Sequence, residues 1–89
     1  MANEITSVVR IGTPEGWHAR PATQFATLVS DSGLTVTIGR TEGPAVRGDS
    51  VLTLLTLGAR FGEELTITVQ PDSDSEVAER LIEQLTALF

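Results

Sequence analysis

The chain's single histidine, His18, lies at the predicted start of a helix. From Ala22 onward, apolar residues recur at i, i+3, i+4 and i+7, which is typical of a helix with one buried face. Pro21 stands early in this segment, where a missing N–H costs little. The unpaired N–H groups of a helix N-terminus carry partial positive charge and bind phosphate-like anions.

Arg20 follows His18 by two residues and supplies a planar cation that can hold phosphate oxygens. A neutral imidazole with a free lone pair can accept a phosphoryl group, and the positive helix end disfavours the imidazolium. The pattern therefore predicts a phosphorylated histidine, His18, with Arg20 contacting the phosphate. The alternative is a surface histidine in a glycine-rich loop beside a solvated arginine. A metal site is not expected, because the chain has no second histidine and no cysteine.

Two segments resemble known motifs. GWHARPAT at residues 16–23 closely resembles the active-site signature of the HPr family, the histidine phosphocarriers of the bacterial sugar phosphotransferase system. GDSVLTLLTLG at residues 48–58 resembles the family's second motif, in which a serine opens a short helix that ends in Leu-Gly. The length and element order match over nearly the whole chain. The resemblance implies a single HPr-like domain over residues 1–89, phosphorylated on Nδ1 of His18.

The resemblance also implies the partners. Enzyme I, charged from phosphoenolpyruvate, would pass a phosphoryl group to His18, and His18 would pass it to a histidine of an Enzyme IIA during sugar uptake. Such a chain is a stoichiometric carrier and no turnover enzyme, although nomenclature can group it with phosphotransferases. We expect it to bind no cofactor and to be monomeric when free. The alternatives are a nitrogen-regulatory or fructose-specific paralogue, a non-catalytic regulatory binding domain, and a purely structural domain.

Ser50 is a candidate regulatory residue. Ser50 or Asp49 can cap the helix that follows, by accepting a hydrogen bond from a first-turn N–H. In some bacteria a dedicated HPr serine kinase phosphorylates the matching serine. Here Asp49 stands where a lysine is common, so a new phosphate dianion would meet a like charge.

The predicted second helix is apolar nearly all round, although it is short. One interpretation buries all of its apolar residues; the other leaves some of them exposed near His18, where partner proteins dock. Trp17 departs from the aliphatic residue usual in the signature, and either contacts a partner or packs over the loop. The proposed interface consists of Trp17, Thr23, Gln24, Thr27, Val51, Leu52 and Leu55.

Composition narrows the function classes. Twelve acidic residues against six arginines give a net charge of −6, which argues against a general nucleic-acid binder. No apolar run is long enough to insert in a membrane, and the first residues lack the features of a signal peptide. A cytoplasmic location is the default expectation.

The order of the predicted elements indicates the fold. We expect strands over residues 4–11, 34–38, 44–47 and 64–70, and helices over 19–29, 50–57 and from a Ser73–Glu76 capping box almost to Phe89. Gly33 is the expected stop of the first helix. The order β-α-β-β-α-β-α predicts an α+β open-faced sandwich, a four-stranded antiparallel sheet with three helices on one face.

Overall fold

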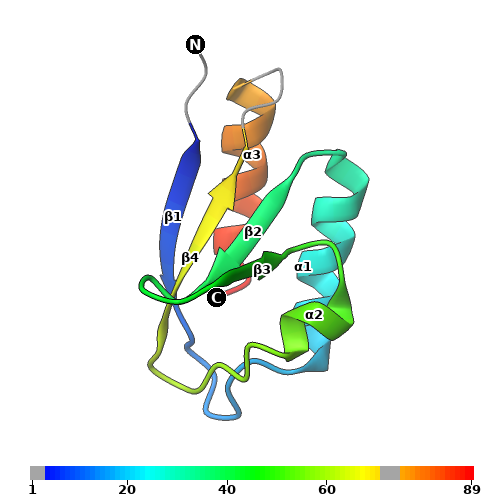
Figure 1. The fold of residues 1–89 in the computed structure, drawn as a ribbon. Helices are drawn as coiled ribbons and strands as arrows, with labels where there is room; N and C mark the ends of the chain where they lie inside the picture. Colours follow the sequence, from blue (N-terminus) through cyan, green and yellow to red (C-terminus); the bar gives the residue numbers. More distant parts are fainter. Residues whose placement is uncertain (1–3, 71–74) are drawn as a thin grey trace.

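A computed structural model describes residues 4–70 and 75–89, and four strands and three helices follow one another there in the predicted order (Figure 1). The elements are β1 (Ile5–Arg10), α1 (Ala19–Ser32), β2 (Val36–Gly39), β3 (Ala45–Arg47), α2 (Val51–Leu55), β4 (Glu64–Val69) and α3 (Ser75–Thr86). All strand pairs are antiparallel, in the order β1-β4-β2-β3. The helices cover one face of this sheet, which confirms the predicted open-faced sandwich.

Strand β4 lies between β1 and β2 and contributes the centre of the core. Its residues Leu65, Ile67 and Val69 are buried, while the residues between them are more exposed. This alternation follows from the two-residue period of a strand, since every second side chain faces the helices. Ile67 pairs with Ser7 on one side and with Ile38 on the other, so the pairing of β4 sets the register of the sheet.

The apolar stripes of the helices close the core. The buried residues of α1 are Ala22, Phe25, Ala26 and Val29, the stripe expected from the sequence. The buried residues of α3 are Ala78, Leu81, Ile82 and Leu85. Helix α1 packs against α2 and α3, and α3 packs against β1 and β4. This packing holds α1 on the helical side of the sheet. Its first turn lies beside the loops that flank α2 (Figure 1).

Helix α1 is longer than expected, since it ends at Ser32 and not at residue 29. The Ser32 hydroxyl donates a hydrogen bond to the Val29 carbonyl (2.6 Å) and accepts one from the Leu34 amide (3.0 Å). Gly33 then takes the left-handed conformation (φ 71°) and ends the helix, as expected. The Ser32 hydroxyl and the Gly33 amide, which donates to the Ser30 carbonyl, thus satisfy backbone groups at the end of the helix.

The other boundaries differ by one or two residues. Strand β2 covers Val36–Gly39, where 34–38 was expected, and β3 starts one residue later than expected. Gly39 extends β2 by pairing with Ala45 of β3, and glycine is needed there because a β-carbon would lie 2.6 Å from the Pro44 carbonyl oxygen. Helix α2 is Val51–Leu55, with Ser50 outside it as the N-cap. Ser73 of the expected capping box lies outside the described residues.

Candidate functional site

His18 is the N-cap residue of α1. Its backbone is extended (φ −136°, ψ −176°), and its carbonyl oxygen accepts the first hydrogen bond of the helix, from the Ala22 amide at 3.1 Å. The side chain makes no capping hydrogen bond and is exposed to solvent. The imidazole therefore stands at the helix N-terminus with its ring nitrogens available.

The first turn of α1 offers positive charge beside this ring. The amides of Ala19 and Arg20 precede any intrahelical acceptor, and Pro21 has no N–H. Within residues 4–70 and 75–89, the exposed Arg20 guanidinium has no hydrogen bond or ion pair. An imidazole, two open amides and an unpaired cation thus follow one another within three residues, an arrangement suited to an anion bound at the ring.

The loop before His18 is held against the chain that follows α2. The Trp17 amide donates to the Ala59 carbonyl at 2.9 Å, and Gly16 has a left-handed backbone (φ 77°). A β-carbon at position 16 would lie 2.7 Å from the same Ala59 oxygen. The Thr13 hydroxyl also donates to the Gly16 carbonyl at 2.8 Å. Segments about forty residues apart in sequence therefore set the entry into α1.

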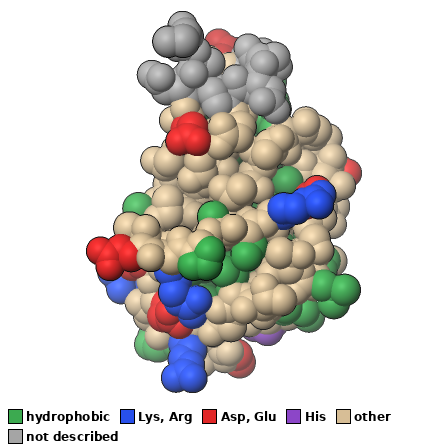
Figure 2. Space-filling view, viewed as in Figure 1, with side chains coloured by type: hydrophobic (Ala, Val, Ile, Leu, Met, Phe, Trp, Pro, Cys, Tyr) green, Lys and Arg blue, Asp and Glu red, His purple; other side chains and the backbone are tan. Residues whose placement is uncertain are grey.

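An apolar patch lies on α2, which packs against α1. Leu52 is 79% exposed and Leu55 36% exposed, whereas Leu54 is fully buried and Val51 packs partly against the core. Figure 2 shows hydrophobic side chains over α2, with the purple of histidine close by at the lower edge of the view. The α1 residues of the predicted interface, Thr23, Gln24 and Thr27, are exposed as well.

Comparison with known proteins places this geometry in a family. The family model described as "PTS HPr component phosphorylation site" matches residues 5–88. The chain belongs to the PTS HPr family. The role of this family is that of a phosphocarrier in the phosphotransferase system.

Individual members of the HPr family are similar over most of their length. Phosphocarrier protein HPr of Streptomyces coelicolor is 41% identical over 80 residues, which is 90% of this chain and 82% of that protein. HPr of Chlamydia muridarum is 30% identical over 86 residues, 97% of this chain and 82% of that protein. The crystal structure of HPr from Bacillus anthracis aligns with a TM-score of 0.81 and 26% identity, covering 98% of each chain.

Trp17 was predicted to belong to the interface, but its side chain is buried. Only 8% of it is exposed, because its ring stacks on Phe89 (centroids 5.1 Å apart, 2° between planes) and meets Phe25 edge-on at 5.9 Å. The expectation that Trp17 offers contact area to a partner is therefore wrong. The aliphatic residue usual in the HPr signature is replaced here by an aromatic one that joins the core.

Ser50 caps α2, as expected. Its hydroxyl oxygen accepts from the Thr53 amide (3.3 Å) and from the Thr53 hydroxyl (3.1 Å). The neighbouring Asp49 carboxylate accepts hydrogen bonds from Arg47 Nε at 3.1 Å and Arg47 Nη2 at 2.8 Å. These bonds lower the pKa of Asp49. Phosphorylation of Ser50 by an HPr serine kinase stays a prediction.

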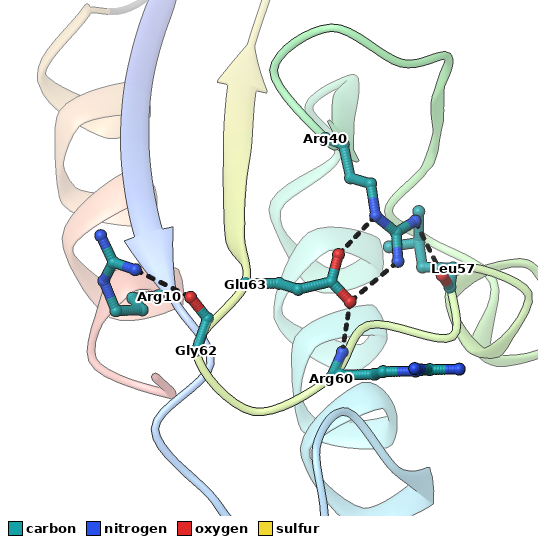
Figure 3. A network of polar contacts seen from close by, with 6 residues as sticks. All are labelled: Arg10, Arg40, Leu57, Arg60, Gly62 and Glu63. Carbon is teal, nitrogen blue, oxygen red and sulfur yellow. Dashed lines mark hydrogen bonds and ion pairs between the residues drawn. The ribbon is translucent and has the colours of Figure 1, made fainter.

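A polar network next to the site was missed at the sequence level. The Glu63 carboxylate accepts hydrogen bonds from the Arg40 guanidinium and the Arg60 amide, and Arg40 also reaches the Leu57 carbonyl (Figure 3). These bonds, the one from Arg40 first, lower the pKa of Glu63 to about 2. Arg40 and Glu63 are 23 residues apart, and no local spacing links them.

Features of two other function classes are absent from the part of the chain that the structure describes. No group of three or more His, Asp or Glu side chains there is placed to hold a metal ion. None of the helices it contains combines the length and the apolar character needed to cross a membrane.

Proposed function

We propose that His18 accepts a phosphoryl group from phosphorylated Enzyme I and donates it to an Enzyme IIA during phosphoenolpyruvate-dependent sugar uptake. The observation that carries the proposal is the exposed imidazole at the N-cap of α1, with no capping bond of its own and with open amides beside it. Membership of the HPr family supports the same role.

The transfer follows from the charges at the helix end. The lone pair of the neutral His18 ring forms a bond to phosphorus while the bond from phosphorus to Enzyme I breaks. The phosphoryl dianion then lies against the amides of Ala19 and Arg20 and the guanidinium of Arg20. In the second step the bond from phosphorus to His18 breaks as the histidine of Enzyme IIA attacks. The chain is returned unchanged, as a stoichiometric carrier.

The docking surface for both partners is the α2 patch with its polar rim on α1. Leu52 and Leu55 provide exposed apolar contact, Val51 contributes its exposed edge, and Thr23, Gln24 and Thr27 surround them. Small apolar contact areas of this kind suit brief encounters. Between encounters the chain is a monomer with a single domain over residues 1–89.

Incubation with Enzyme I and phosphoenolpyruvate carrying a labelled phosphate tests the proposal. We expect one acid-labile phosphate per chain, its transfer to Enzyme IIA on addition, and no labelling of His18→Ala. Arg20→Ala should be labelled more slowly, because the dianion loses one contact. An unlabelled wild-type chain, or equal labelling of His18→Ala, would contradict the proposal. Comparing sugar-type with nitrogen-type Enzyme I under the same conditions separates the paralogous branches.

A further inference from the structure

Two side chains tether both ends of the short segment that follows α2. Arg40, the residue that follows β2, donates to the Leu57 carbonyl at 2.9 Å. Glu63 accepts from the Arg60 amide at 2.8 Å. The two side chains also bind each other, through Arg40 Nε at 2.6 Å and Nη2 at 3.1 Å (Figure 3). Residues 57–60 are thereby held at their first and last positions by one ion pair.

The segment between these tethers is the one on which the loop of His18 rests. Ala59 is buried, and its carbonyl accepts the Trp17 amide at 2.9 Å. Gly16 approaches the same peptide so closely that a β-carbon would meet the Ala59 oxygen and the Arg60 Cα, at 2.7 and 3.3 Å. A displacement of residues 57–60 would therefore move the Trp17 amide, and with it His18, the extended N-cap residue of α1.

We propose that Arg40 and Glu63 are positioning residues for phosphoryl transfer at His18. They hold the Ala59 carbonyl where it anchors Trp17, and so keep the imidazole at the open amides of α1. This inference rests on the proposed function, but it adds residues outside the two motifs of the sequence. None of the contacts of Arg40 or Glu63 that the structure gives is to His18, so their effect passes through the backbone.

Adjacent glutamates provide a matched test. Glu64 also forms an ion pair, with Arg10 at 2.7 Å, but its carboxylate does not bind residues 57–60. Glu63→Gln and Glu64→Gln each remove one charge at neighbouring positions. Arg40→Lys is a second variant, which keeps the positive charge but loses the guanidinium fork.

The experiment measures phosphorylation by Enzyme I at several concentrations of the chain. We expect Glu63→Gln and Arg40→Lys to lower the rate at saturation by about 3- to 10-fold, because small misplacements of a reacting group are costly. The concentration for half-maximal rate should change little, since the α2 patch is intact. Glu64→Gln should match the wild type in both quantities.

Amide hydrogen exchange, with folding checked by circular dichroism, gives a readout independent of activity. The Trp17 amide should exchange faster in Glu63→Gln and Arg40→Lys than in Glu64→Gln. Equal saturating rates and equal Trp17 exchange in all variants would overturn the inference while leaving the proposed function intact. A change confined to the half-maximal concentration would also overturn it, by assigning the pair to docking. Absence of phosphorylation in the wild type would instead refute the proposed function.

Discussion

Gly16 holds the loop before His18 in a conformation that residues with a β-carbon rarely adopt. Its φ is 77°, and a β-carbon would lie 2.7 Å from the Ala59 carbonyl oxygen. We expect Gly16→Ala to lower the free energy of unfolding by about 1 kcal/mol through the backbone conformation and by about 2 kcal/mol more through the clash. Urea denaturation measures the total.

Gly33→Ala is the matched control for this substitution. Gly33 has a similar φ of 71°, but nothing lies within 4 Å of the β-carbon it would gain. The free energy of unfolding of Gly33→Ala should fall only by the conformational contribution, about 1 kcal/mol. Equal losses for the two variants would show that the approach of Gly16 to Ala59 is not tight.

Glu63 gives the molecule a defined response to acid. Its pKa is about 2 in the folded chain against an ordinary value of 4.5, because Arg40 and the Arg60 amide bind the carboxylate. A lowered pKa means that the ionised group stabilises the fold fully above pH 4.5, and that this stabilisation is lost as the pH falls towards 2. Urea denaturation should show wild type and Glu63→Gln converging in stability over that range. A constant difference between them would contradict this assignment.

For single residues, chemistry that depends on neighbours in the chain could be predicted from the sequence, whereas packing between distant segments could not. His18, Arg20 and Pro21 are neighbours in the chain, so their arrangement at a helix start follows from spacing alone. The burial of Trp17 depends on Phe89, whose approach to the loop is decided by the docking of the last helix. Expecting Trp17 at the surface was therefore an error that only tertiary packing could correct.

Among the elements, the short helix α2 depends on Ser50, the N-cap residue that precedes it. The helix has only five residues, and Ser50 satisfies the Thr53 amide. Ser50→Ala should cost about 1 kcal/mol of stability, because a first-turn donor loses its acceptor. Ser50→Asn, which can still accept that bond, should retain most of it. Thermal denaturation of the three chains measures the difference, and equal midpoints would argue against capping by Ser50.

Docking of Enzyme I should depend on the exposed side chain of Leu52 in α2. Leu52 is 79% exposed, so Leu52→Ser should leave the fold stable while raising the concentration of chain needed for half-maximal phosphorylation by Enzyme I. Val8→Ser is the control, because Val8 is 60% exposed on β1, at the opposite edge of the sheet from β3. If both substitutions affect phosphorylation equally, the patch on α2 has no specific role.

The type of each element was predictable, and its ends were less so. The stripe in α1 and the alternation in β4 are strong periodic signals, and both are confirmed. The ends depend on contacts from elsewhere. Ser32 bonds the Val29 carbonyl in the last turn of α1, and Gly39 extends β2 by pairing with Ala45 across the hairpin. The spacing of apolar residues does not predict these hydrogen bonds and close backbone contacts.

On the scale of the whole molecule, the strand order has a consequence for synthesis of the chain. Strand β4 lies between β1 and β2 and pairs with both. Of the strand pairs in this sheet, a chain that still lacks residues 64–69 can form only the β2–β3 hairpin. During synthesis, β1 therefore has no pairing partner until β4, about sixty residues further along the chain, has been made. Pairing over so long an interval is slow, and the four-stranded sheet can be completed only after residues 64–69 have been synthesised.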